Sequence, residues 1–147
     1  RVDRVDTNEQ GDYVVIDYKG SITDKESGTK AETRDEVELP PYVQALIYAQ
    51  GLKKLHKTKP YGAFYLNYKA KDIKGLLAGA YNPAQLDLSE FTRKKSEVAL
   101  AFDVYLDQIE ELCIPLVEAL VSGNIAPHPQ SSKSCTWCPV WGCPNRL

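Results

Sequence analysis

The segment YVVIDYKGS, residues 13–21, combines the pattern of a buried strand with two charges that such a strand does not ordinarily carry. Its first four residues are aromatic or aliphatic, Asp17 follows them, and Lys19 comes two positions later. Because side chains alternate between the two faces of a strand, Asp17 and Lys19 project from one face and Tyr18 from the other. The segment therefore predicts a strand that ends in a carboxylate and an amine on a common face.

A second strand is expected just before it, over residues 1–6. The intervening stretch TNEQGD, residues 7–12, is rich in residues that favour chain reversal, so an antiparallel hairpin is predicted. In that hairpin Asp3 can approach Asp17. Two neighbouring carboxylates repel each other and are tolerated mainly when a cation lies between them.

Mg²⁺ is the natural cation for such a pair, because it takes hard oxygen ligands and keeps several waters. The backbone carbonyl of Tyr18 is a further candidate ligand beside Asp3 and Asp17. Lys19 would then lie next to the metal, where a fixed positive charge can orient a water or stabilise negative charge. These are the components of metal-assisted phosphodiester hydrolysis. The alternative is an ion pair at an exposed sheet edge, which contributes little to stability.

The rest of the chain predicts a small mixed sheet flanked by helices, an α/β fold. A polar loop is expected over residues 20–38, a helix over 42–55 after two prolines, strands over 62–68 and 73–79, and a long helix over 92–122. An apolar stripe marks the long helix, Pro115 is expected to kink it and Gly123 to end it. We expect residues 1–124 to form the core domain and residues 125–147 a loop-like, cysteine-rich tail.

On the helix over 42–55, Gln44 and Tyr48 are four residues apart and so lie on one face. Such a pair forms a polar helix edge more often than a site. Two runs of positive residues, 53–59 and 93–95, are expected to be solvated surface or, in a nuclease, to contact phosphates with an affinity that falls with salt. Tyr61, Tyr65, Tyr68 and Tyr81 are expected mainly to pack rather than to stack on bases.

Composition places few constraints on function. The chain has 147 residues, 43% of them hydrophobic, and a formal net charge of −2, which gives no overall bias toward nucleic acid. No apolar run is long enough for a membrane span, so we expect a cytoplasmic protein without a membrane partner. The opening RVDRVD is typical of the middle of a strand, and we expect the chain to be a fragment truncated at its N-terminus.

Three of the four cysteines, Cys135, Cys138 and Cys143, fall within nine residues. The C-x₂-C spacing suits zinc or an iron–sulfur cluster, and three ligands need a fourth. His128 is one candidate, which would favour zinc. Cys113 lies in the apolar stripe of the long helix and is interpreted as a small hydrophobic residue.

RVDRVD, VVIDYKGS and QALIYAQ, in this order, resemble the RecB-type nuclease domain of the PD-(D/E)XK superfamily, and the tail resembles the cysteine segment of its AddB-like members. The resemblance implies a restriction-endonuclease-like core and a DNA exonuclease coupled to a helicase in repair or recombination. The resemblance also implies action on single strands or duplex ends with Mg²⁺ or Mn²⁺. It implies that Asp3 and Asp17 bind the metal, that Lys19 is catalytic, and that Gln44 and Tyr48 line the site.

The same resemblance implies a [4Fe–4S] cluster held by the tail cysteines and by an upstream cysteine that this chain does not contain. In this fragment the tail thiols are expected to be apo, to hold zinc or to be oxidised to a disulfide. The sequence departs from the family pattern at Gly20, where Thr or Ser usually follows the lysine. Two alternatives stay open at this point. One is a DNA-binding module that keeps the fold without turnover, and the other is a zinc-binding interaction module.

Overall fold

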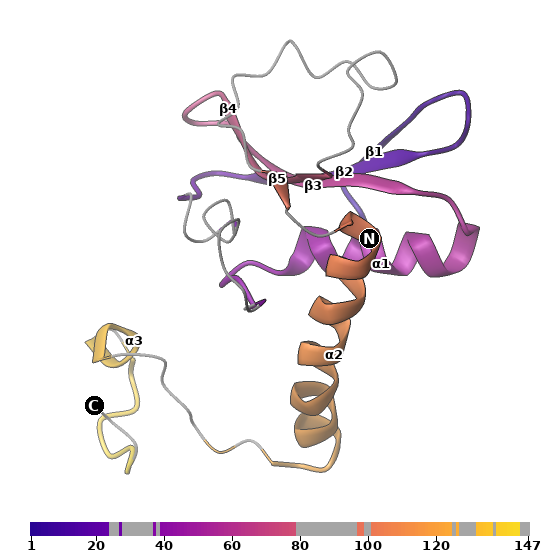
Figure 1. Cartoon of the computed structure of the whole chain (residues 1–147). Coiled ribbons are helices and arrows are strands. Elements are labelled where there is room, and N and C mark those ends of the chain that lie inside the picture. Colours follow the sequence, from indigo (N-terminus) through magenta and orange to yellow (C-terminus); the bar gives the residue numbers. More distant parts are fainter. Residues whose placement is uncertain are drawn as a thin grey trace. The chain divides into compact units, whose positions relative to one another are not determined.

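The computed structural model describes residues 1–23, 27, 37, 39–78, 97–98, 101–124, 126, 132–136 and 138–144. The chain divides into two compact units, Arg1–Ile114 and Pro115–Leu147. The first unit contains the sheet and the first helix (Figure 1).

The described part of the first unit contains a mixed sheet of five strands. The strands are β1 (Arg4–Thr7), β2 (Tyr13–Lys19), β3 (Pro60–Asn67), β4 (Asp72–Ala78) and β5 (Glu97–Val98), adjacent in that order. β1 pairs with β2 and β3 with β4 in antiparallel fashion, whereas β2–β3 and β4–β5 are parallel. The predicted α/β class with a small mixed sheet is confirmed.

The turn between β1 and β2 is organised by Asn8, as the sequence predicts. Its side-chain Oδ1 accepts hydrogen bonds from the backbone N–H groups of Gln10 and Asp12 at 3.1 and 2.8 Å. Gly11 has a φ of +82°, which a residue with a side chain rarely adopts. This turn fixes the hairpin register, in which Arg4 lies opposite Ile16 and Thr7 opposite Tyr13.

The helix α1 (Gln44–His56) lies along one face of the sheet (Figure 1). It connects β2 to β3, which is why those strands can run parallel. The side chains of β2 that alternate toward α1 join one hydrophobic core with residues of α1, of β3 and of the helix that begins at Phe102. This core comprises Tyr13, Val15, Ile22, Ala45, Leu46, Ala49, Ala63, Tyr65, Phe102, Tyr105, Leu106 and Ile109. Val14, Ile16, Phe64 and Ile73 form a smaller cluster.

The helix α2 (Phe102–Val121) begins ten residues later than the sequence pattern predicts. Within the expected helix, Glu97 and Val98 instead extend the sheet, pairing with Leu77 and Ala78. Residues 92–96 lie outside the described part. The correction has a physical reason: the stripe that packs into the core starts at Phe102, and the edge of β4 offers backbone partners to the residues before it.

Only the first half of the predicted apolar stripe is buried. Leu112, Leu116 and Leu120 are exposed, whereas Cys113 is half-buried and packs against the main core. Burial raises the pKa of the Cys113 thiol, with a smaller contribution from Glu110, so this cysteine behaves as a small apolar side chain as expected. Pro115 lies inside the helix.

The C-terminal end of α2 has the predicted glycine stop. Gly123 has a φ of +79°, its N–H bonds the carbonyl of Leu120 at 3.1 Å, and the N–H of Asn124 bonds that of Ala119 at 2.8 Å. This pair of bonds is the Schellman arrangement. The tail beyond it is not entirely loop-like as predicted, because Ser132–Thr136 form the short helix α3. No helix in the described part of the chain is long and apolar enough to span a membrane.

Polar contacts join α1 to α2 where the sequence suggested only a basic surface. The buried amide of Gln50 donates to Asp107 Oδ1 at 2.8 Å and to Glu110 Oε2 at 2.6 Å. Lys53 bonds Asp107 Oδ1 at 2.7 Å, and Lys54 pairs with Glu110. Two of the five basic residues in the first run, Lys53 and Lys54, therefore join α1 to α2.

These contacts predict a small loss of stability in acid. Hydrogen bonds from Lys53 and then Gln50 lower the pKa of Asp107, and bonds from Lys54 and then Gln50 lower that of Glu110. Because the folded pKa values lie below the unfolded ones, the stabilisation is complete above the ordinary carboxyl pKa and is lost as the pH falls through the folded values. Both carboxylates are partly exposed, so we expect the resulting loss in the free energy of unfolding to be less than about 1 kcal/mol.

The measurement is urea unfolding at pH 6 and pH 3, compared between the wild type and the Asp107→Asn/Glu110→Gln variant. The wild type should lose more stability between the two pH values than the variant does. Equal losses would show that these carboxylates are not linked to folding.

Candidate active site at the end of β2

The predicted acid and amine meet at the C-terminal end of β2. Asp17 is 2% exposed, and its Oδ2 lies 2.6 Å from the Nζ of Lys19. Lys19 keeps 22% of its side chain in contact with solvent. The contact is an ion pair without hydrogen-bond geometry, since Asp17 Oδ2 accepts no hydrogen bond. A buried carboxylate oxygen is thus held against a cation that solvent can reach.

A chain of hydrogen bonds continues from Lys19 onto α1. Lys19 Nζ donates to Gln44 Oε1 at 2.8 Å, and Gln44 Nε2 donates to Tyr48 Oη at 2.8 Å. Gln44 and Tyr48 are the two residues whose four-residue spacing placed them on one helix face. Four of the five predicted site residues therefore form one continuous series of contacts, from the strand to the first turns of the helix.

Asp3, the fifth, lies one residue before β1. Arg4 is opposite Ile16, so continuing the register by one position places Asp3 opposite Asp17. Asp3 Oδ2 accepts a hydrogen bond from the backbone N–H of Tyr18 at 3.1 Å. The hairpin thus brings an exposed carboxylate beside a buried one, as the turn sequence predicted.

Two tyrosines that sequence reasoning did not assign to the site surround Lys19. Its Nζ lies 5.6 Å from the ring centroid of Tyr42 and 5.9 Å from that of Tyr65, within the range of cation–π attraction. Tyr65 is 1% exposed and lies opposite Asp17 in the parallel pairing of β2 with β3. The sequence alone does not give this pairing register, which is why Tyr65 was not assigned to the site.

Tyr65 also caps α1. Val43, at the N-cap position, makes no side-chain capping bond. Instead the Tyr65 hydroxyl accepts a hydrogen bond from the N–H of Ala45 at 3.1 Å and donates to the carbonyl of Tyr42 at 2.9 Å. A residue of the sheet thereby satisfies a first-turn amide that a Ser or Asp would ordinarily satisfy. Burial is the main reason that the pKa of Tyr65 is raised, so its hydroxyl stays protonated.

Comparison with known protein families places the chain in one superfamily. The profile of the PD-(D/E)XK nuclease superfamily matches residues 1–143. The chain belongs to the PD-(D/E)XK nuclease superfamily. No curated protein and no solved structure matches it. Superfamily membership makes the chain a nuclease-type domain with a restriction-endonuclease-like fold.

The departure from the resemblance at Gly20 has a local explanation in this PD-(D/E)XK domain. A Cβ at this position would lie 2.7 Å from the hydroxyl oxygen of Tyr68, whose backbone N–H bonds the carbonyl of Lys19 at 3.1 Å. A side chain at position 20 would displace the Tyr68 ring end. Glycine therefore leaves room for the Tyr68 side chain beside Lys19.

The oxygen atoms at this site fit the divalent metal that PD-(D/E)XK nucleases typically use. Asp17 Oδ2 is a buried polar atom with no hydrogen-bond donor, and Asp3 adds a carboxylate beside it. In the described part of the chain no group of three His, Cys, Asp or Glu side chains is arranged to hold a metal ion. Mg²⁺ needs no such cage, because it is commonly bound by one or two carboxylates and several waters.

The tail cysteines do not converge in the described structure. No disulfide joins any of the four cysteines, and Cys135, Cys138 and Cys143 are not part of a group of three that could hold a metal ion. The N–H of Cys138 bonds the carbonyl of Cys135 at 3.3 Å. His128, the other candidate ligand, lies outside the described residues, as do Arg93, Lys94, Lys95 and Tyr81.

Replacing Tyr65 by phenylalanine tests its double role. Losing the hydroxyl leaves the Ala45 amide and the Tyr42 carbonyl unsatisfied, so we expect a loss of about 1–3 kcal/mol in the free energy of unfolding. The measurement is urea denaturation, with Tyr68→Phe as the control because Tyr68 is exposed. An equal effect of the two variants would refute the capping role.

Proposed function

We propose that the chain is a metal-dependent deoxyribonuclease. Its catalytic site, at the C-terminal end of β2, would hydrolyse the phosphodiester bonds of DNA. The observation that carries the proposal is the continuous contact series Asp17–Lys19–Gln44–Tyr48, found in a member of a nuclease superfamily. An ion pair of purely structural value would not require a residue from a neighbouring helix to hold its cation in place. Here Gln44 does so from α1.

In this proposal Asp3 and Asp17, with the carbonyl of Tyr18, hold Mg²⁺ or Mn²⁺. When bound, the ion supplies charge stabilisation for the phosphoryl oxygens and a water of lowered pKa. The reaction forms a bond from the water oxygen to phosphorus and breaks the bond from phosphorus to the sugar oxygen. The water gives up a proton, and the departing sugar oxygen gains one.

The chain's own residues orient these groups. Lys19 presents an ammonium group that can bind a phosphoryl oxygen as negative charge accumulates on it. Gln44 fixes that ammonium, and Tyr48 fixes Gln44, so the cation does not have to be ordered when the substrate arrives. The rings of Tyr42 and Tyr65 exclude water from one side of Lys19, which strengthens its field.

DNA is the proposed substrate class. The exonuclease mode, the preference for single strands or duplex ends, the role in repair or recombination and a helicase partner rest on the resemblance to RecB-type nucleases alone. The test is incubation of end-labelled and circular DNA with Mg²⁺, Mn²⁺ or a chelator. Metal-dependent shortening of linear DNA supports the proposal. Binding without cleavage under all conditions would favour a non-catalytic module that keeps the fold.

For the tail we propose that Cys135, Cys138 and Cys143 bind zinc or a [4Fe–4S] cluster together with a ligand outside the described residues. The support is the C-x₂-C spacing with a third cysteine nearby. Metal analysis of protein purified without oxygen tests it. Stoichiometric zinc or iron is expected, and protein free of both would refute it.

A further inference from the structure

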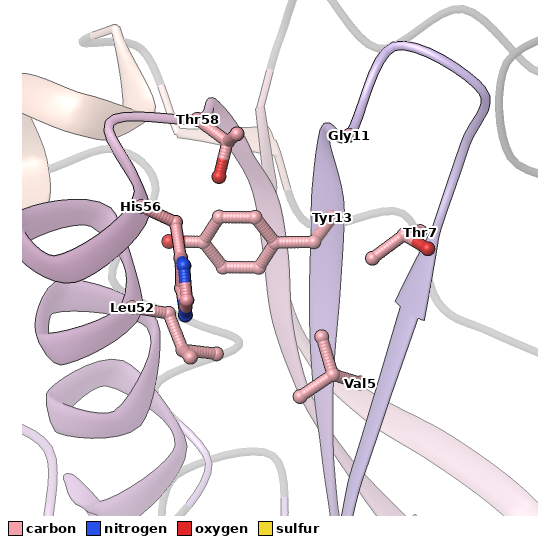
Figure 2. Close-up of a pocket in the computed structure, with 7 residues that line it drawn as sticks. All are labelled: Val5, Thr7, Gly11, Tyr13, Leu52, His56 and Thr58. Atoms are coloured by element: carbon pink, nitrogen blue, oxygen red, sulfur yellow. The ribbon is translucent and has the colours of Figure 1, made fainter.

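A pocket of about 390 Å³ lies between the hairpin and the C-terminal end of α1, at the other end of β2 from Lys19. It is lined by described residues of β1, β2, the turn between them, α1 and the segment after α1: Val5, Thr7, Gly11, Tyr13, Leu52, His56 and Thr58 (Figure 2). The volume is within the range of pockets that take small organic groups. None of these residues belongs to the catalytic site proposed above.

The chemistry of the walls suits a flat, largely apolar group. Val5 and Leu52 contribute aliphatic surface, and Tyr13 and His56 contribute aromatic rings to the lining (Figure 2). The Tyr13 hydroxyl donates to the carbonyl of Ala49 at 2.6 Å, which fixes that ring to α1. Thr7 and Thr58 contribute the hydroxyl groups of the lining.

Two lysines beside the pocket are available for an anion. Lys57 and Lys59 flank Thr58 in the chain, and both are exposed. Neither ammonium group pairs with a carboxylate among the described residues, in contrast to Lys53 and Lys54. The nearby carboxylate of Asp12 accepts a hydrogen bond from the backbone N–H of Lys59 at 3.2 Å.

A largely apolar pocket with adjoining cations is complementary to a nucleotide, which joins an aromatic base to a phosphate. We propose that this pocket binds a base of the DNA strand whose backbone is held at the Asp17 site, with Lys57 and Lys59 contacting the adjoining phosphates. The proposal rests on the proposed nuclease function. It adds a second contact that the strand makes away from the cleaved bond.

The separation of the two sites sets the expected length of the strand. Tyr13 and Lys19 are six residues apart on β2, which corresponds to about 20 Å at 3.3 Å per residue. At about 3.4 Å per nucleotide, the spacing of a duplex strand, this span needs about six nucleotides, and fewer if a single strand is extended. Affinity should therefore rise steeply once an oligonucleotide is long enough to reach both sites.

The experiment is fluorescence anisotropy of labelled oligothymidylates of three, six and twelve nucleotides, in chelator so that no cleavage occurs. Thr7→Phe fills the pocket from an exposed strand position where an aromatic residue is well tolerated. We expect it to weaken binding of the long oligonucleotides about tenfold and to remove most of the gain in affinity between three and six nucleotides. An abasic substitution at one position of the hexamer should lower wild-type affinity similarly, but not that of Thr7→Phe.

A matched pair of variants tests the lysines. Lys57 and Lys71 both have a positive φ, 54° and 53°, which asparagine tolerates, so Lys57→Asn and Lys71→Asn remove equal charge at comparable positions. Lys57→Asn should reduce the salt dependence of binding the longer oligonucleotides by about one phosphate contact, a slope change of about 0.7. Lys71→Asn should leave the dependence of affinity on length unchanged.

The outcomes separate this proposal from the nuclease proposal. Length-dependent binding that Thr7→Phe removes supports the pocket, even if the protein cleaves no DNA. Cleavage by the wild type, together with unchanged binding by Thr7→Phe at every length, would overturn the pocket alone. Absence of oligonucleotide binding, or equal losses in Lys57→Asn and Lys71→Asn at every length, would also overturn it.

Discussion

Replacing Asp17 by asparagine is expected to abolish divalent-metal binding and phosphodiester cleavage while the domain stays folded. The change removes the charge of the one buried carboxylate at the site and keeps its shape. Cleavage should fall by about three orders of magnitude, which corresponds to about 4 kcal/mol of transition-state stabilisation. The measurements are calorimetric titration with Mn²⁺ and the rate of release of labelled nucleotides.

The same substitution should leave stability nearly unchanged. Asp17 is 3% exposed in its side chain, so the ion pair with Lys19 carries a desolvation penalty that offsets much of its attraction. A neutral amide avoids that penalty, and Lys19 keeps its bond to Gln44. We expect the free energy of unfolding to change by less than about 1 kcal/mol.

Asp6→Asn is the matched control. Asp6 lies in the same hairpin but is paired with Arg4, through bonds of 2.7 Å to both carboxylate oxygens. Register places it opposite Val14, on the face away from Asp17. Loss of Mn²⁺ binding in Asp17→Asn but not in Asp6→Asn supports the site. Undiminished cleavage by Asp17→Asn would refute the mechanism.

The parts of this site that the sequence predicts are those set by local geometry. The Asn8 turn fixes the hairpin register, and register together with strand alternation places Asp3, Asp17 and Lys19 on one face. Gln44 and Tyr48 follow from the four-residue spacing of a helix. Each of these inferences needs only a few consecutive residues and a regular repeat.

What the sequence does not predict depends on pairing between distant segments. Tyr65 reaches the site because β3 lies parallel to β2, and no local pattern gives that register. The bonds from Gln50 to α2 span more than fifty residues, so the lysines beside it looked like free surface. The predicted start of the long helix was wrong for the same reason, because Glu97 and Val98 pair with β4 instead of joining the helix.

Lys19→Met is expected to separate catalysis from metal binding. Methionine keeps the length and the apolar part of the side chain and removes the ammonium group. Turnover should fall by about two to three orders of magnitude, because the charge that stabilises the phosphoryl oxygens is lost. Mn²⁺ should bind at least as tightly as in the wild type, since the ammonium 2.6 Å from Asp17 Oδ2 no longer competes with the ion.

Without metal, Lys19→Met should be less stable than the wild type, because Asp17 is left as a buried charge without its cation. We expect a loss of about 2 kcal/mol or more in the free energy of unfolding. Adding Asp17→Asn to Lys19→Met should restore most of that loss, and Mn²⁺ should restore it in the single variant. Urea unfolding with and without Mn²⁺ measures both effects.

Lys69→Met, at an exposed lysine in the turn after β3, is the control for removing a positive charge from the domain. It should change neither turnover nor stability appreciably. If Lys19→Met cleaves as fast as Lys69→Met, the lysine has no catalytic role, and the contact with Asp17 is a structural ion pair. If Lys19→Met loses Mn²⁺ binding as well as turnover, Lys19 supports the metal site rather than the reaction. Tight Mn²⁺ binding with lost turnover is the result that assigns the two functions to adjacent residues of one strand.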